Sequence, residues 1–408
     1  MFRRPSGNRA LDWVNFFIAD AQTGFGPFVA VYLTTQKWTQ VEIGFALTLG
    51  TIVALVSQIP AGALVDAVRN KRAVASAALC GLIAAALLLA IWPARLPVLL
   101  AQMLHGVASC VITPSIAALS LGLAGHAALG ERLGRNARFG ALGNGLAAAV
   151  MGATGAWLSS KAVFFLTAGL CVPALAAVWL VPAGSHAVAP PATKGANWAA
   201  LRRLAADRRL LVFALCVMLF HLSNAAMLPL AAAEVTMRAG SFANVIIGAC
   251  IVVPQVVVAS LSPWVGRAAA DHGRRWILLL GWAALPVRAL LLAVLPGAWP
   301  LVLGQAVSGL SAAVFGVMLP LLAADLTAGT RHFNLCLGFL GLAVYVGAAI
   351  STSLGGGIAD AAGIQAAFVS LGTIGAAGTL VIWMAMPETR PALATVPQRI
   401  DGSAARVG

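Results

Sequence analysis

The sequence predicts an all-α membrane protein of twelve transmembrane helices in two pseudo-symmetric six-helix bundles, with both termini in the cytoplasm. Three observations support this fold class. Hydrophobic residues make up 61% of the 408-residue chain and charged residues only 9%, too few charges for the surface of a soluble protein. Apolar segments long enough to cross a bilayer recur along the whole chain. The second half also repeats the first at a fixed offset, which indicates two related bundles.

The predicted spans are the segments with about 20 mostly apolar residues, the length that crosses the hydrocarbon core. They are 12–33, 43–65, 73–93, 97–121, 138–158, 162–181, 210–232, 243–265, 276–296, 300–324, 334–356 and 365–386. The first follows three arginines, as a signal peptide would, but it carries Asp20 and Gln22 and lacks a small-x-small cleavage site. We therefore expect it to be retained as the first helix.

The connection at 182–209 is the longest and most polar between predicted spans. It divides the chain into an N-terminal bundle at 1–181 and a C-terminal bundle at 210–388, with a cytoplasmic tail at 389–408. The last part of the connection alternates apolar residues and arginines, a pattern typical of a helix on a membrane surface.

The positive charge of the chain is distributed unevenly across the predicted membrane. Of the 26 Lys and Arg, 21 fall on the side of the two termini, four on the opposite side (Lys37, Arg95, Lys161 and Arg238), and Arg288 lies within a span. This asymmetry places the termini in the cytoplasm. It also explains the net charge of +14 as a belt facing anionic lipid headgroups, so we expect membrane lipids rather than nucleic acid as partners.

An internal repeat becomes visible when the sequence is shifted by 204 residues. Gly62 then falls on Gly266, Phe16 on Phe220 and Phe164 on Phe368. Matches at one offset across several helices indicate two halves in the same orientation, which is one of the known transporter plans.

The loop after the second span has Gly62, three residues, Asp66, and then a basic cluster of Arg69, Lys71 and Arg72. The counterpart in the second half is looser, with its acidic residue displaced by one position; it contains Gly266, Asp271, Arg274 and Arg275. Together with the span count and the repeat, these loops resemble the loop signature of the major facilitator superfamily.

The resemblance implies a transporter in which these two loops form a conformational latch. Asp66 at the end of a span can accept hydrogen bonds from the N-terminus of a neighbouring helix, and the basic residues can pair with acidic groups or lipid. Ordinary positive-inside topology explains the basic residues equally well, but it does not explain an Asp four residues after a Gly.

Polar residues inside predicted spans are candidate sites because they are costly in a bilayer. Asp20 lies near the middle of the first span, and the repeat maps it onto Asn224 in the seventh, three residues after His221. A carboxylate at this depth can load and release a proton, so we predict that Asp20 couples transport to protons and, with Gln22, contributes to the substrate site. A structural hydrogen bond to a neighbouring helix is the alternative.

Two further polar stripes lie on predicted spans at helical spacing. The fourth span carries Gln102, His105, Ser109 and Thr113, and the tenth carries Gln305 and Ser308. The family arrangement implies that spans one, four, seven and ten line the cavity. Gln102, His105, His221, Asn224 and Gln305 are therefore predicted to bind substrate, with helix–helix hydrogen bonding as the alternative.

Arg288 lies in the middle of the ninth span, which the family places at the periphery. It can pair with a carboxylate, bind an anionic group or extend its side chain outward to the headgroups. Asp325, near the end of the tenth span, is interpreted as a helix-end charge. The six cysteines lie inside apolar runs without ligand-like spacing, so neither metal nor disulfide is expected.

The sequence thus predicts a secondary active transporter in the cell inner membrane, a monomer that moves a small-molecule substrate by proton-coupled efflux (proton antiport). The chain lacks a nucleotide-binding loop, so no cofactor or ATP is expected, and no nucleophile–base cluster suggests an enzyme. The runner-up is a proton-coupled importer of a small metabolite, and the third possibility is a non-transporting membrane sensor with a transporter fold.

Overall fold

The chain folds almost entirely into helices in the computed structural model, which describes residues 7–23, 25, 27–182, 196–231, 243–295 and 297–389. The first half forms α1 (Gly7–Thr23), α2 (Pro27–Thr35), α3 (Gln40–Ala67), α4 (Lys71–Ile91), α5 (Arg95–Trp157) and α6 (Ala162–Leu180). The second half forms α7 (Ala196–Ala206), α8 (Arg208–Asn224), α10 (Ala243–His272), α11 (Arg274–Val294), α12 (Ala298–Leu326), α13 (Phe333–Ala362) and α14 (Ile364–Ala385). Residues 183–195 of the predicted connection and most of the predicted tail lie outside the described ranges.

Helices cover the predicted spans, but two of their boundaries differ from the sequence prediction. The first predicted span is divided between α1 and α2, and Pro27 begins α2 at the position where its missing N–H costs nothing. The fourth and fifth predicted spans belong to one 63-residue element, α5, which is broken at Gly125. Gly125 has φ +68 and ψ 174, a backbone conformation that only glycine adopts readily.

Ten helices in the described ranges are long and apolar enough to cross a membrane. Two features separate this number from the twelve predicted spans. The helix α1 has 17 residues and is too short by itself, while α5 is counted once although each of its two parts has the length of a span. The structure is therefore that of an all-helical, multi-pass membrane protein.

Local sequence explains where several helices begin. Thr39 and Glu42 form a reciprocal capping box at the start of α3, and the Asn70 side chain accepts from the backbone N–H of Ala73 at the start of α4. Asp207 caps α8 in the same way. These side chains satisfy backbone donors that a helix N-terminus leaves without a partner.

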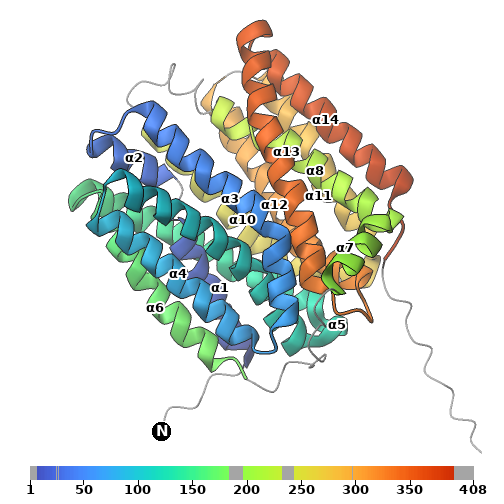
Figure 1. The fold of residues 1–408 in the computed structure, drawn as a ribbon. Coiled ribbons are helices and arrows are strands. Elements are labelled where there is room, and N and C mark those ends of the chain that lie inside the picture. Colours follow the sequence, from blue (N-terminus) through green and yellow to red (C-terminus); the bar gives the residue numbers. More distant parts are fainter. Residues whose placement is uncertain are drawn as a thin grey trace, which may run out of the picture.

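The buried side chains form two main clusters. One draws all its members from residues between Ala10 and Val181, and the other consists mostly of residues between Leu210 and Met386. Where the two sets of helices meet, α5 packs against α10 and α3 packs against α13. Figure 1 shows α3 beside α13 at the front of the molecule.

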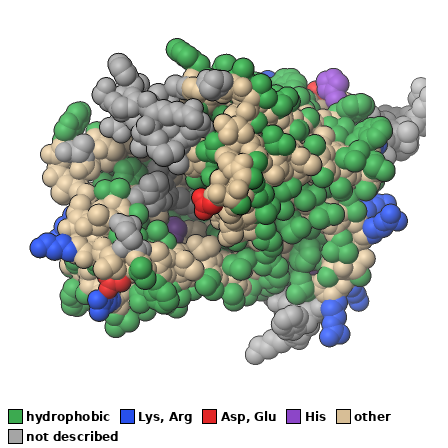
Figure 2. Space-filling view, turned by 90° about the horizontal axis from the view of Figure 1, so that it is seen from above, with side chains coloured by type: hydrophobic (Ala, Val, Ile, Leu, Met, Phe, Trp, Pro, Cys, Tyr) green, Lys and Arg blue, Asp and Glu red, His purple; other side chains and the backbone are tan. Residues whose placement is uncertain are grey.

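The two ends of the helix bundle differ in shape. One end, which we call the base, contains the start of α1, the α3–α4 and α10–α11 junctions and the junction within α5; it is the lower end in Figure 1. The opposite end, the open face, contains the α2–α3 turn and the α13–α14 junction. Figure 2 looks onto the open face and shows a hollow within it. Large apolar side chains such as Val56, Trp157 and Met384 point outward, as expected for helices surrounded by lipid.

Candidate functional site

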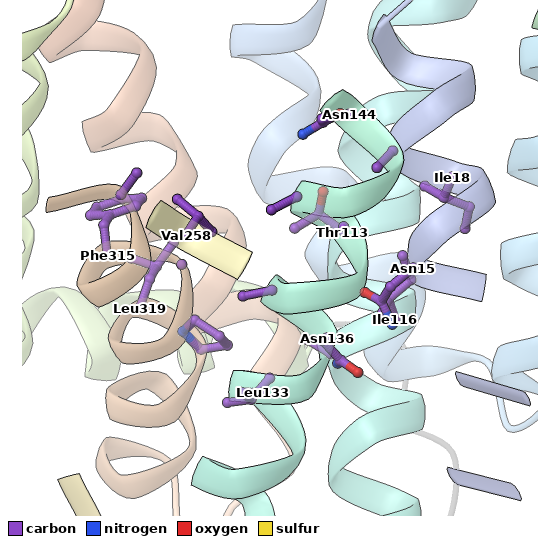
Figure 3. A pocket seen from close by; sticks show the side chains of 18 of the residues that line it. Asn15, Ile18, Thr113, Ile116, Leu133, Asn136, Asn144, Val258, Phe315 and Leu319 are labelled. Atoms are coloured by element: carbon purple, nitrogen blue, oxygen red, sulfur yellow. The ribbon is translucent and has the colours of Figure 1, made fainter. Parts of the chain in front are cut away.

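A cavity of about 490 Å³ lies between the two sets of helices. Figure 3 shows Asn15, Thr113 and Asn144 on one wall and Val258 and Phe315 on the other. The first wall comes from α1 and both parts of α5, and the second comes from α10 and α12. This volume is within the range of about 300–1,000 Å³ that small-molecule sites occupy.

The cavity wall combines apolar side chains with neutral polar groups. Its polar side chains are Asn15, Thr113, Asn136, Asn144 and Gln255, and no charged residue is among those that line it in the described part of the chain. The Asn15 Nδ2 donates to the carbonyl of Leu11 (2.7 Å), so one hydrogen-bonding group of that amide is already occupied. An amphipathic solute with a mostly apolar body fits this chemistry.

A buried ionic cluster lies below the cavity, toward the base. Asp12 of α1 forms ion pairs with Arg132 and Arg135 of α5, and the side chains of both Asp12 and Arg132 are almost fully buried. The Arg132 Nε also donates to Asn136 Oδ1 (2.9 Å), and the Asn136 Nδ2 donates to Ser120 Oγ (2.7 Å). The cavity-lining Asn136 is therefore held in place by the ionic cluster.

The sequence reasoning missed this cluster. It left Asp12 without a role at the start of the first span and assigned Arg132 to a loop, whereas both lie in helices and are buried. The spacing of Arg132, Arg135 and Asn136 on one helical face was the available signal. Their partner, however, lies about 120 residues earlier in the chain.

At the base, backbone surfaces of the two halves meet at glycines. A Cβ added to Gly62 of α3 would collide with the Asn334 carbonyl of α13, and one added to Gly266 of α10 would collide with the Gly130 carbonyl of α5. These two contacts are copies of each other, because both Gly62 and Gly266 and their partners Gly130 and Asn334 are separated by 204 residues.

A second pair of contacts follows the same symmetry one turn further along. A Cβ on Gly338 would collide with the Gln58 carbonyl, and one on Gly134 would lie 2.5 Å from the Ser262 carbonyl. Such contacts also occur within one half, as between Gly143 and the Phe16 carbonyl and between Gly347 and the Met218 carbonyl, whereas a Cβ on Gly44 or Gly152 would meet nothing within 4 Å. The base is therefore closed by two matching seams, one between α3 and α13 and one between α5 and α10.

Asp66 is positioned on the first seam. Its carboxylate accepts hydrogen bonds from the backbone N–H groups of Asn334 (3.1 Å) and Leu335 (2.8 Å) and from the Asn334 side chain (2.7 Å). Asn334 and Leu335 form the first turn of α13, where free N–H groups and the helix dipole favour a negative charge. Asp66 thus joins the first half to the second.

The basic residues of the first loop have different surroundings. Lys71 contacts the carbonyls of Val65 and Asp66, and Arg72 donates to the Val181 carbonyl (3.0 Å) at the end of α6. Arg69 is exposed. Lys71 and Arg72 therefore stabilise the first half internally, in contrast to Asp66, which reaches across the seam.

The second loop is organised in another way. Arg274 forms a buried ion pair with Asp325 (3.0 Å), and its backbone N–H and that of Arg275 donate to Glu388 (2.8 and 3.1 Å). Asp325 is thus a paired residue, more than a helix-end charge. Asp271, the displaced counterpart of Asp66, is exposed.

The other predicted site residues are distributed over both halves. Asp20 and Gln22 fall within α1, but their side chains lie outside the described part of the structure. Gln102 is buried against Gly50 of α3. The His105 ring stacks on Phe25 at 4.1 Å and contacts the Ser109 hydroxyl at 3.2 Å.

In the second half, His221 lies edge-on to Phe315 with 4.8 Å between ring centroids, and Asn224 accepts from Arg288 (2.7 Å). Gln305 of α12 is buried. None of the five predicted binding residues with described side chains is among those that line the 490 Å³ cavity. The structure instead brings two of the polar residues, Asn224 and Arg288, into direct contact.

Comparisons with known proteins give a consistent result. The model of the Major Facilitator Superfamily matches residues 11–253 and 215–407. MFS-type transporters from two strains of Mycobacterium tuberculosis, both described as uncharacterized, are 36% identical over 396 residues, covering 94% of this chain and 94% of the relative.

Two solved structures share the fold. A human organic anion transporter superposes with a TM-score of 0.69 at 16% identity, covering 93% of this chain and 100% of that chain. A proton:xylose symporter bound to 6-bromo-6-deoxy-D-glucose has a TM-score of 0.68 at 14% identity, with coverage of 94% and 96%.

Proposed function

Because the chain belongs to the major facilitator superfamily, a family of membrane transporters, we propose that it is a secondary active transporter. It moves a small solute by alternating access of a central site to the two sides of the membrane. The observation that carries this proposal is the asymmetry of the two ends: matching seams close the base, while a cavity lies between the two halves above it.

The proposed topology has twelve spans, with α1 and α2 forming the first and α5 supplying the fourth and fifth. The bundles are residues 1–181 and 210–388, joined by the linker 182–209 and followed by the tail 389–408. The base lies on the cytoplasmic side of the inner membrane, since most Lys and Arg fall on that side. We propose that the protein works as a monomer.

Alternating access is tested by measuring the distance between the two halves at the open face. Lys161 and Gln365 are exposed and are related by the 204-residue repeat, so both are replaced by cysteine and spin-labelled. Cys80 is replaced by alanine, because the other five native cysteines are buried. Double electron–electron resonance should then show two distance populations, of which the longer corresponds to the present structure.

Substitutions in the seams that open the base should increase the population with the shorter distance between positions 161 and 365. A single distance that does not respond to pH or to substitutions in the seams would instead favour the membrane sensor with a transporter fold.

Proton coupling is proposed to use Asp20. The other carboxylate of α1, Asp12, is already paired with two arginines, so Asp20 is the acidic residue of this helix that remains for the coupling step. Efflux is favoured over import because the cavity wall is apolar and neutral. A proton-coupled importer of a small metabolite is the second candidate.

The coupling is tested in proteoliposomes that contain the pH-sensitive dye pyranine, under an imposed pH gradient, with ethidium and benzoate as probe solutes. A transported probe should change the proton flux in the parent protein and in Asp360→Asn, a control at an exposed carboxylate of α13. Asp20→Asn should lose the probe-dependent flux. If Asp20→Asn behaves like the parent, coupling through Asp20 is wrong.

A further inference from the structure

Arg288 is a fully buried arginine in the second half. Its side chain, on α11, is 1% exposed, so it does not extend outward to the headgroups. The Nη1 donates to Asn224 Oδ1 of α8 (2.7 Å) and to Ser308 Oγ of α12 (3.2 Å). Both partners are neutral, and both are partly exposed. The two hydrogen bonds therefore place the guanidinium beside side chains of α8 and α12 that are themselves partly exposed.

The positive charge of Arg288 has no counter-charge among the described side chains. The described ion pairs of Asp12, Glu42 and Asp325 are made with other arginines, and Asp66 is bonded to the start of α13. None of these four carboxylates forms an ion pair with Arg288. A buried, unpaired charge is strongly unfavourable, which calls for an anion at this position.

Several buried nitrogens around Arg288 are without a hydrogen-bond partner in the described part of the chain. They are Nε and Nη2 of Arg288 itself, Nε2 of Gln305 and Nε2 of His221. Gln305 lies one helical turn from Ser308, and His221 one turn from Asn224, so these groups share faces with the two partners of Arg288. Each of the four nitrogens can donate a hydrogen bond.

The site is also connected to the central cavity. Phe315, which lines the cavity, packs edge-on against His221 with ring centroids 4.8 Å apart. A ligand whose apolar body occupies the cavity could therefore present a polar end toward His221 and Arg288. Because every unpartnered group there can donate, that end should consist of acceptors alone, and a planar guanidinium fork matches a carboxylate best.

We propose that Arg288, with Gln305 and His221, binds the carboxylate of an organic anion whose apolar part occupies the cavity between the halves. This inference rests on the proposed transport function and specifies the substrate class of that site. Asn224 and Ser308 act as positioning residues that hold the Arg288 side chain toward the bound carboxylate.

The test is ligand-dependent thermal unfolding of the full-length protein in dodecyl maltoside without lipid. Benzoate is the probe, and benzamide, its neutral analogue, is compared at the same ionic strength. Benzoate should raise the Tm of the parent in a saturable way, and benzamide should not. Arg288→Gln should weaken the apparent benzoate affinity roughly tenfold or more, because a charge-assisted bidentate pair is lost.

Two variants serve as matched comparisons. Arg95→Gln removes an arginine that is 81% exposed and paired with Glu42, and it should keep the full benzoate response. Asn224→Asp keeps the oxygen that accepts from Arg288 and adds a carboxylate beside the guanidinium, so it should fold and lose the benzoate response. This second variant decides the question even if Arg288→Gln does not fold.

Other outcomes would overturn the proposal. Equal shifts with benzoate and benzamide, or an unchanged benzoate shift in Asn224→Asp, would show that Arg288 does not bind the carboxylate. Asp20 and Glu234 are two carboxylates whose side chains lie outside the described part of the structure. If the parent does not respond but Asp20→Asn or Glu234→Gln does, a carboxylate of the chain itself neutralises Arg288. If phosphatidylglycerol raises the Tm and benzoate does not, the anion is a lipid headgroup. None of these results bears on alternating access, which the spin-label distances test separately.

Discussion

Asp12 illustrates how much a single side chain contributes to the wall of the cavity. It is 3% exposed and forms ion pairs with two arginines of α5, and Arg132 in turn holds the cavity-lining Asn136. Predicting this cluster from the sequence requires knowing which helix faces α1. Each residue by itself is a charged residue near the end of a predicted span, where charges are common. Pairing across 120 residues is a property of the packing.

We expect Asp12→Asn to destabilise the protein by about 3–5 kcal/mol, the usual cost of removing one partner from a buried ion pair. The measurement is thermal or denaturant unfolding in detergent. The control is Glu42→Gln, which removes the charge that pairs with a largely exposed arginine but keeps an oxygen for the capping box with Thr39, so it should have little effect. Equal stability of the two variants would mean that the Asp12 cluster is not a buried, desolvated network.

Asp66 and Asp271 are counterparts in the sequence but differ in their environments. Asp66→Asn leaves one acceptor oxygen for the three donors at the start of α13, so the base-closed state should lose population. Asp271→Asn changes an exposed side chain and should shift the population less. Spin-label distances between positions 161 and 365 measure both effects. Identical shifts would mean that the two loops act as equal halves of the latch.

At the level of elements, the hydropathy of the sequence showed where most helices lie, but it did not show the residues at which they begin and end. The apolar segments at 43–65 and 73–93 correspond to α3 and α4, because lipid requires continuous backbone hydrogen bonding within each span. The junction within α5 was not predictable, since helical geometry continues on both sides of Gly125. The partners of the glycines at the seams also depend on the conformation in which the halves meet.

The seams predict a position-specific response to small side chains. We expect Gly62→Ala and Gly266→Ala to disfavour the closed base, because each new Cβ would overlap a backbone carbonyl of the other half. The matched controls are Gly44→Ala in α3 and Gly152→Ala in α5. Both helices form seams, but at these two positions the Cβ would meet nothing within 4 Å.

These controls should leave the distance populations unchanged and should keep or slightly raise stability, since alanine favours the helix by up to about 1 kcal/mol over glycine. A shift of equal size in all four variants would contradict the role of the seams.

At the scale of the whole molecule, the repeat predicted which positions of the two halves correspond, while the orientation that the charge bias favours stays a prediction. The offset of 204 residues identified Gly62 and Gly266 as equivalent, and the structure adds that their contact partners are equivalent as well. The composition of the candidate site was harder to predict from the sequence. The described residues that line the cavity are mainly apolar or neutral, and such residues do not stand out in a chain that is 61% hydrophobic.

The orientation can be tested with reporter fusions in bacteria. Alkaline phosphatase fused after Lys161, in the connection before α6, should be active because it reaches the periplasm. Green fluorescent protein fused after residue 389 should fluoresce because the tail stays in the cytoplasm. A phosphatase fusion after Arg203 provides the opposite control and should be inactive. The reverse pattern would invert the proposed topology.

At their glycines, the two seams at the base bring main chain against main chain, and this has a consequence for the kinetics of the proposed conformational change. Side-chain contacts can weaken gradually, as rotamers change one at a time, whereas a glycine facing a carbonyl can separate only when the helices themselves move. Because the α3–α13 and α5–α10 contacts are copies of each other, a rigid rotation of one bundle releases both together. The base should therefore open in a concerted, all-or-none step, without long-lived half-open intermediates.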